Sequence, residues 1–334
     1  MRLQRHWLSF RCPRPGRFFR RMAAAVLAFG MAGAALAADA PAVCVPTVTP
    51  SGDAVQKASG PALDRGFLWR LEKDGRSSWL YGTMHVGKPA WMSPGARVRA
   101  ALRQSDILAL ELDLTDPATL AVFTEPLDAA VMARILTPDR QRRLDRQIAL
   151  ACLPAHALGR LRPILQATTL AGLAVRHDGM FSEWGSEQFL ALHARSHAKP
   201  VVALEDARTQ LRALTGDSEA DEIAQVDETL DELESGQARA MGAELAAVWA
   251  TSDWKKLSDY RRWCDCVKTP ADESALQRLL DDRNPGLADG IARVHGQGHR
   301  VFAAVGALHM VGPKGLPALL AARGFRVTRQ VPAP

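Results

Sequence analysis

Two histidines follow short apolar runs in the same manner. The stretches LYGTMHVG and AVGALHMVG place His85 and His309 three positions after Gly82 and Gly306. Imidazole nitrogens bind zinc, manganese or iron, and they also move protons during hydrolysis. A small residue three positions before each histidine lets a strand end turn closely, so that the imidazole points over the sheet edge. The repeated pattern predicts that both histidines serve one site, with the two glycines as structural turns.

Two carboxylates occupy comparable positions. The apolar run ILAL is followed by Glu111, and PVVAL is followed by Glu205. In open α/β sheets, ligands bind outside the carboxyl ends of the strands. We therefore predict His85, Glu111 and His309 as metal ligands, and Glu205 as a general base beside them. Each residue alone also fits a structural role, so only the combination supports the hypothesis.

The elements that must position these side chains follow from the apolar patterning. It predicts an α/β fold, with a central mixed β-sheet and a large helical insertion. Asp74-Gly75 is a hairpin-turn signal between two strands. Helical periodicity dominates residues 115–198 and 206–297. The predicted strands cover residues 67–83 (a hairpin), 107–114, 200–205, 300–306 and 325–331, with a short helix at 315–324.

The N-terminal segment has the pattern of a secretory signal peptide. Arg20-Arg21 precedes an apolar run that closes with Ala35-Leu36-Ala37. The alternative is a membrane anchor, but the apolar stretch of 17 residues from Met22 to Ala38 is short for a spanning helix. We predict a signal peptide at 1–37, a flexible lead-in at 38–65 and one domain at 66–331. The mature protein is then periplasmic or secreted, with no stable membrane span.

The charge distribution argues against nucleic acid as a partner. The chain has 42 basic and 36 acidic residues, a formal net charge of +6. Seven of the arginines lie in residues 1–37, which contain no acid. The remainder, with 35 basic and 36 acidic residues, is close to neutral. The predicted domain therefore lacks the net positive charge that nucleic-acid binding favours.

Four cysteines remain after the predicted leader: Cys44, Cys152, Cys264 and Cys266. An even number in an exported protein indicates disulfides rather than a zinc site. One compatible pairing is a short-loop bridge between Cys264 and Cys266, which leaves Cys44 with Cys152. Two long-range bridges are equally compatible with the sequence.

The motifs also occur in a recognisable order: YGTMHVG, LALELD, GSEQFLALHARSHAKPVVALED, DDRNPGLADGI and FAAVGALHMVG. In this order they resemble the TraB/GumN family, relatives of the animal Tiki proteases. The resemblance covers roughly residues 66–330 and implies an erythromycin-esterase/ChaN-like domain. In the Tiki branch it implies metal-dependent proteolysis. The positions that it implies for the site are Gly82, His85, Glu111, Arg283, Gly306 and His309, with Glu187 and Glu205 at acidic positions of the central motif and Asn284 beside Arg283.

Together these observations predict an exported metal-dependent hydrolase that cleaves a peptide or protein substrate. A divalent ion, zinc, manganese or cobalt, would polarise a carbonyl group and activate a water molecule. Glu205 or Glu187 would accept the proton, Arg283 would steady the developing negative charge, and Asn284 would contact the substrate. The alternative is a non-catalytic periplasmic ligand-binding or regulatory protein, because the same ligands would also serve binding without turnover.

Overall fold

The computed structural model describes Cys44 and residues 62–333. These residues belong to one unit of the chain, Ala42–Pro334. The predicted signal peptide (1–37) and most of the predicted lead-in (38–65) lie outside the described residues.

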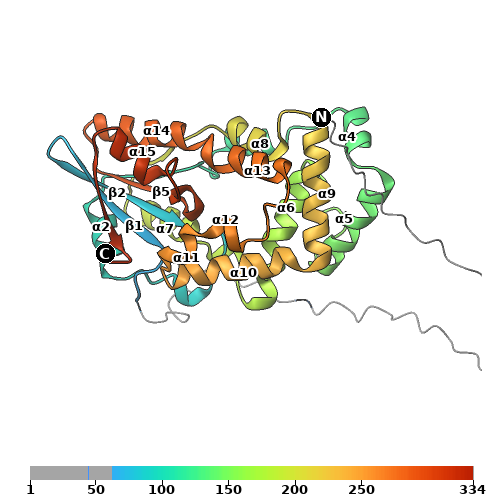
Figure 1. Ribbon diagram of the computed structural model, residues 1–334, viewed down its shortest axis with the longest axis horizontal. Helices are drawn as coiled ribbons and strands as arrows, with labels where there is room; N and C mark the ends of the chain where they lie inside the picture. Colours follow the sequence, from blue (N-terminus) through green and yellow to red (C-terminus); the bar gives the residue numbers. More distant parts are fainter. Residues whose placement is uncertain (1–43, 45–61, 334) are drawn as a thin grey trace, which may run out of the picture. The chain divides into compact units, whose positions relative to one another are not determined.

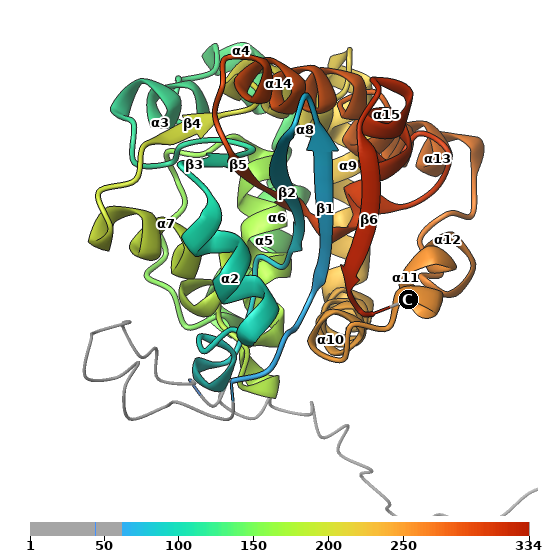
Figure 2. The ribbon, with the colours of Figure 1, turned by 90° about the vertical axis from the view of Figure 1, so that its left-hand side faces the viewer.

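Within the described residues, six strands form a mixed sheet in the order β4-β3-β5-β2-β1-β6 (Figure 2). The neighbours β4, β3, β5 and β2 are parallel, whereas β1 runs antiparallel to both β2 and β6. The predicted α/β fold with a central mixed sheet is confirmed. The strands are β1 (Phe67–Lys73), β2 (Arg76–Thr83), β3 (Ile107–Leu110), β4 (Val201–Ala203), β5 (Val301–Gly306) and β6 (Arg326–Val331).

Helices fill most of the remaining residues that the structure describes. None of those in the described part is long and apolar enough to cross a membrane. The α-helices are α2 (Ala96–Gln104), α3 (Pro117–Phe123), α4 (Ala129–Ile135), α5 (Pro138–Leu150), α6 (Pro163–Ala174), α7 (Ser186–Ser196), α8 (Ala207–Thr215), α9 (Glu219–Ser235), α10 (Gln237–Ala250), α11 (Trp254–Ser258), α12 (Tyr260–Trp263), α13 (Pro270–Leu276), α14 (Asn284–Gly296) and α15 (Leu316–Ala322). Short 3-10 turns are η1 (Pro89–Trp91), η2 (Val175–Asp178), η3 (Ser182–Trp184) and η5 (Ala307–Met310), and η4 (Gln277–Asp281) is a π-helical turn.

Both faces of the sheet are covered, because successive side chains of a strand point to opposite faces. On one face, Oγ of Ser78 in β2 lies 2.8 Å from Nδ1 of His295 in α14. On the other face, the ring of Tyr81 packs against Trp249 of α10, with centroids 6.4 Å apart. Burial from both sides explains why the central strands β3 and β5 read as nearly continuous apolar runs.

The predicted helical insertion lies between β3 and β5 in the sequence, with β4 in its middle. Helices α4, α5, α6 and α9 group away from the strands in Figure 1. They enclose an apolar cluster that includes Ile135, Leu144, Leu170 and Leu230. This part of the insertion therefore has a hydrophobic core separate from the one around the sheet.

Two strands end earlier than the sequence indicated. The predicted strand 107–114 stops at Leu110, and Oδ1 of Asp113 accepts a hydrogen bond from the Thr115 amide at 2.9 Å in the turn that follows. The predicted strand 200–205 stops at Ala203. Glu111 and Glu205 consequently stand just beyond the sheet edge, where their side chains can face a site.

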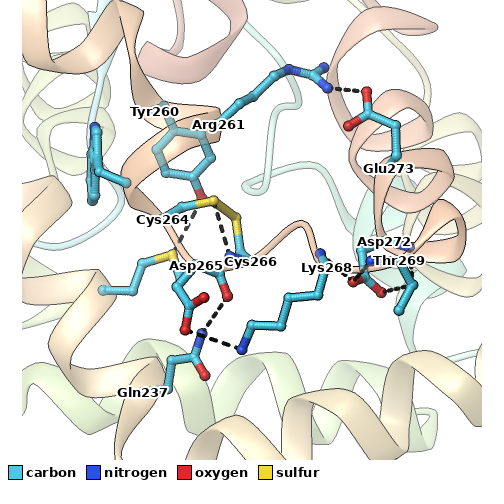
Figure 3. The surroundings of a disulfide bond; sticks show 12 residues. Gln237, Tyr260, Arg261, Cys264, Asp265, Cys266, Lys268, Thr269, Asp272 and Glu273 are labelled. Carbon is cyan, nitrogen blue, oxygen red and sulfur yellow. Dashed lines mark hydrogen bonds and ion pairs between the residues drawn. A yellow bond between two sulfur atoms is a disulfide. The ribbon is translucent and has the colours of Figure 1, made fainter.

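The four cysteines form two disulfides, Cys44–Cys152 and Cys264–Cys266, with Cα atoms 5.6 and 5.0 Å apart. The pairing that the sequence left open is thus one long-range and one short-loop bridge. Figure 3 shows the short bridge beside the ring of Tyr260. There the side chain of Gln237 in α10 donates to the backbone oxygen of Asp265 at 2.9 Å. This contact ties the short loop to α10.

The two bridges differ in the length of chain that they close. Cys152→Ser opens a loop with a sequence separation of 108, so we expect it to lower the free energy of unfolding by about 2–4 kcal/mol. Cys266→Ser opens a loop with a separation of only 2 and serves as the matched control, with an expected loss of about 1 kcal/mol or less. Urea unfolding of both variants measures the difference. Equal losses would contradict the loop-length argument.

Candidate functional site

Four side chains predicted from the sequence meet at one edge of the sheet. His85 follows β2, Glu111 follows β3, and Glu205 follows β4. His309 lies in η5, directly after β5. Because β2, β3, β4 and β5 are parallel, their carboxyl ends share this edge.

Gly306, the last residue of β5, is the point around which three of these side chains gather. A Cβ atom built there would lie 3.3 Å from Oε1 of Glu111, 3.6 Å from Cδ2 of His309 and 4.0 Å from Nε2 of His85. The Gly306 amide also donates to Oε1 of Glu111 at 2.7 Å. Two imidazoles and one carboxylate therefore surround a small space beside the backbone of Gly306.

The two motif glycines act through their lack of a side chain. Gly306 has a φ of −47°, which any residue can adopt, and Gly82 is not among the glycines with positive φ. A Cβ atom on Gly82 would come within 3.2 Å of the Cα of Ala307, so β2 packs closely against η5. The two glycines were expected to allow tight turns at the strand ends. Instead, they allow close packing, which keeps the two histidine-bearing segments adjacent.

His85 is held by Glu187 at the start of α7. Its Nδ1 lies 2.9 Å from Oε1 of Glu187, which leaves Nε2 on the side of Gly306. The His85 side chain is 75% exposed, whereas Glu187 is 23% exposed. The charge of Glu187 raises the pKa of His85 above its ordinary value. Burial opposes ionisation of Glu187, but the charge of His85 outweighs it and lowers the pKa of that carboxyl.

The position of Glu187 depends on a backbone link between α7 and the loop after β2. The Ser186 amide donates to the backbone oxygen of Met84 at 2.9 Å. The Met84 amide donates in return to Oγ of Ser186 at 2.8 Å. Ser186 and Met84 are the chain neighbours of Glu187 and His85, so this pair of hydrogen bonds fixes the carboxylate beside the imidazole.

His309 is buried and neutral. Its Nδ1 lies 2.7 Å from Oδ1 of Asn284, and Nδ2 of that amide donates to the backbone oxygen of Lys314 at 2.9 Å. Since an amide oxygen only accepts, Nδ1 carries the proton and Nε2 carries the free electron pair. Burial lowers the pKa of His309 to about 4. Asn284 was predicted to contact substrate, but it is buried and both ends of its amide are engaged, so its role is to orient His309.

Arg283 lies between the two carboxylates, after the π-helical turn η4. Its Nε donates to Oε2 of Glu205 at 3.0 Å, and its Nη2 donates to both Oε1 of Glu205 and Oε2 of Glu111. Its Nη1 faces Nε2 of His309 at 3.3 Å and donates to the backbone oxygen of Leu279. Single π-helical turns are frequent at functional sites, because they change the direction in which the neighbouring side chains point.

The pKa values of the two carboxylates beside Arg283 are shifted in opposite directions. Burial opposes ionisation of Glu111, but His309, Arg283 and His85 together lower its pKa to about 2. For Glu205 burial is the larger effect, and its pKa is raised even though Arg283 acts against the increase. Both oxygens of Glu205 are held by Arg283, whereas Glu187 keeps a partly exposed carboxylate.

One residue of the site had no sequence signal. Nε2 of Gln210 in α8 lies 3.4 Å from Oε2 of Glu111 and 3.4 Å from Oε1 of Glu205. In the sequence, this glutamine cannot be distinguished from any other polar residue of a helix. Only the fold shows that this amide spans the two carboxylates.

The donor set has the chemistry of a metal site, but its three members are not arranged as ligands. Nδ1 of His85 and of His309 each meets a side-chain oxygen, as is usual for imidazoles that bind a metal through Nε2. Glu111, however, is engaged by the Gly306 amide and by Arg283. In residues 62–333 and Cys44, no three His, Cys, Asp or Glu side chains form a group that would hold an ion. Glu111 and Nε2 of His309 would both have to leave Arg283 to complete such a site.

Comparisons with known proteins confirm the resemblance to the TraB/GumN family. The sequence model of the TraB/PrgY/gumN family matches residues 67–329. The chain is 25% identical to the uncharacterized protein YbaP of Shigella flexneri over 248 residues, 73% of this chain and 88% of that protein. It is 34% identical to metalloprotease TIKI1 of Xenopus tropicalis over 86 residues, 25% of this chain but only 17% of that protein. No solved structure matches, so the ChaN-like assignment stays a prediction.

Proposed function

The chain belongs to the TraB/PrgY/gumN family, and from this premise we propose that it is a metal-dependent hydrolase that cleaves peptide bonds. The observation that carries the proposal is the pair of oriented imidazoles, His85 and His309, which meet Glu111 beside Gly306 at the carboxyl edge of the sheet. The name of one relative, a metalloprotease, supports the same class of reaction, although the match covers a small part of that protein.

His85, His309 and Glu111 would hold the ion after Glu111 and His309 have released Arg283, with zinc, manganese or cobalt as candidates. When bound, a divalent ion polarises a carbonyl group and lowers the pKa of a bound water. Glu187 keeps the proton of His85 on Nδ1, and Asn284 does the same for His309, so that both Nε2 atoms can face the ion. Because the pKa of His85 is raised, its imidazole holds a proton on each nitrogen, and the proton on Nε2 has to leave before a metal can bind there.

The remaining charged residues have distinct proposed roles. Glu187 is ionised and partly exposed, which suits it to accept a proton from water. Glu205 is less suited to that role, because Arg283 engages both of its oxygens. Arg283 would supply positive charge for the oxygen of the substrate carbonyl as negative charge develops there.

Export and a peptide or protein substrate belong to the same proposal. The leader pattern of residues 1–37 supports secretion. The two disulfides are typical of an oxidising compartment such as the periplasm or the cell exterior. The near-neutral charge of the remaining chain supports a substrate other than nucleic acid.

A second candidate is hydrolysis without a metal, and one observation favours it. Arg283 places its guanidinium against Glu111 and near His309, where it supplies a fixed positive charge. The pair of His85 and Glu187 would then take the proton of the attacking water. The third possibility is a periplasmic ligand-binding or regulatory protein with no turnover, which the same ligands would serve.

Metal removal separates these possibilities. We expect dialysis against a chelator to abolish cleavage of a peptide library by the purified protein, and added manganese, cobalt or zinc to restore it, because the ion activates the water. Elemental analysis should find a metal in the wild-type protein and in the control His156→Ala, whose histidine lies in an exposed turn, but not in His309→Ala. Full activity after chelation would favour the second candidate. A bound metal with no cleavage would favour the third.

A further inference from the structure

Arg283 contacts two of the three side chains that are proposed to hold the ion. Its Nη2 donates to Oε2 of Glu111 at 2.5 Å, and its Nη1 lies 3.3 Å from Nε2 of His309. Nδ1 of His309 carries the proton, so Nε2 offers its electron pair to the guanidinium. The other oxygen of Glu111 accepts from the Gly306 amide at 2.7 Å. Arg283 therefore engages electron pairs through which Glu111 and His309 would bind an ion.

The same guanidinium has further contacts that involve neither of those side chains. Its Nε donates to Oε2 of Glu205 at 3.0 Å, and its Nη2 donates to Oε1 of Glu205. Two parallel N–H bonds to one carboxylate form a bidentate pair, which is a strong arrangement. Nη1 also donates to the backbone oxygen of Leu279 at 2.9 Å. These contacts can hold Arg283 in place when Glu111 and His309 are released.

The charges around Arg283 are not matched one to one. Burial opposes ionisation of Glu111, yet nearby positive charges, including Arg283, lower its pKa to about 2. Both oxygens of Glu205 accept from Arg283, as those of an ionised carboxylate do. The neighbouring His85 has its own partner in Glu187. One guanidinium thus serves two carboxylates, and with a divalent ion on Glu111 each carboxylate would have a cation of its own.

The three side chains that share this charge are nearly buried. The exposed fraction of the side chain is 8% for Arg283, 12% for Glu111 and 6% for Glu205. Burial opposes the charge of Arg283, but its bonds to Glu205 and the charge of Glu111 outweigh it and raise its pKa. Two cations that lie close together repel each other strongly where water is excluded. Contact of Glu111 with Arg283 therefore disfavours an ion on the same carboxylate.

We propose that Arg283 is an internal competitor of the metal ion, and that Glu205 is the positioning residue that retains the guanidinium once Glu111 and His309 are released. This inference rests on the proposed metal-dependent function, since it concerns the regulation of the same site. It gives Glu205 a role other than the general base that the sequence predicted. The bond network around Arg283 then sets how tightly the protein binds its metal.

Zinc titration of the chelator-treated protein, followed by isothermal titration calorimetry at neutral pH, tests the competition without any turnover. Arg283→Met should bind zinc about 10-fold or more tightly than the wild-type protein, because Glu111 and His309 are then free of the guanidinium. Arg300→Met, which removes an exposed arginine paired with Asp106, is the matched control and should leave the affinity unchanged. Loss of the signal in His309→Ala identifies the binding as that of this site.

Glu205→Gln should have the opposite effect. The amide keeps the shape of the side chain but offers Arg283 one acceptor and no charge, so the guanidinium stays on Glu111 and zinc affinity falls by about 10-fold or more. Asp106→Asn is the control for the loss of a carboxylate. In the Arg283→Met background, Glu205→Gln should change the affinity by no more than about 3-fold, because a positioning residue acts only through its partner. A full loss there would make Glu205 a direct ligand and overturn the proposal.

Arg283→Lys separates direct contact from charge. Lysine keeps the positive charge, but its compact ammonium lacks the fork that reaches both carboxylates and His309. We expect this variant to bind zinc about 3-fold or more tightly than the wild-type protein. Equal affinity would mean that charge alone governs binding and would contradict the assignment. Because it retains a cation beside the buried carboxylates, this variant also provides the test if Arg283→Met does not fold, as judged by circular dichroism.

The titrations distinguish failure of this inference from failure of the proposed function. Zinc binding that depends on His309 but is equally tight in the wild-type protein, Arg283→Met and Arg283→Lys would overturn the competition and leave the metal site standing. No binding in any of these proteins, or binding that survives His309→Ala, would remove the metal site and the competition with it.

Discussion

Replacing His309 by alanine is expected to lower peptide cleavage on the order of 10³-fold or more, the scale found when one member of a catalytic unit is lost. The substitution removes the electron pair on Nε2, which faces Nη1 of Arg283 at 3.3 Å. It also leaves Oδ1 of Asn284 without its imidazole partner. The measurement is the rate of metal-dependent cleavage by the folded variant, with circular dichroism to verify the fold.

His85→Ala should cause a loss of similar size, although its side chain is largely exposed and its removal should affect stability little. Because the two histidines are proposed to hold one ion, the double variant should be hardly worse than either single variant. His156→Ala, in an exposed turn, should retain full activity. If the two single effects multiplied in the double variant, the histidines would act independently and the one-site proposal would fail.

Arg283→Met is expected to lower the free energy of unfolding by about 3–5 kcal/mol, since it leaves two buried carboxylates without their cation. Side chains of Glu111 and Glu205 are only 12% and 6% exposed, so water cannot replace the guanidinium. Arg300→Met, which breaks the exposed pair with Asp106, is the matched control and should change stability little. Urea unfolding measures both. A loss in Arg283→Met no larger than that of the control would contradict the argument.

The loss of unfolding free energy in Arg283→Met should also depend on pH. In the wild-type protein the pKa of Glu111 falls from its ordinary 4.5 to about 2, so its contribution to stability is present above pH 4.5 and is lost as pH falls toward 2. Without Arg283, burial of both carboxylates favours their protonated forms and raises their pKa values. The variant then loses stability as pH rises, and the gap to wild type should be wider at about pH 8 than at about pH 5.

The strand ends of the site could be predicted because each follows a strong local pattern. The runs before His85, Glu111, Glu205 and His309 are short and apolar, and parallel strands place such ends on one edge. The boundaries of β3 and β4 were less predictable. Whether an apolar run continues as a strand depends on pairing with its neighbours, and the residues themselves do not show it.

The contacts that orient the site could not be read from the sequence. Glu187 and Asn284 come from helices far along the chain and Arg283 from the turn before α14, and their directions are set by tertiary contacts. Asn284 illustrates the limit, because a polar residue near a helix start looks the same whether it meets substrate or supports a histidine.

The order of the strands has a consequence for how the chain folds. β5 sits between β2 and β3 at the centre of the sheet, yet it begins at residue 301 of 334. On the ribosome, β2 and β3 emerge about two hundred residues before the strand that joins them. Such long-range pairing folds slowly and leaves strand edges open in the meantime. A chain released before residue 301 lacks the strand that connects the two halves of the sheet, and with it the segment that carries His309.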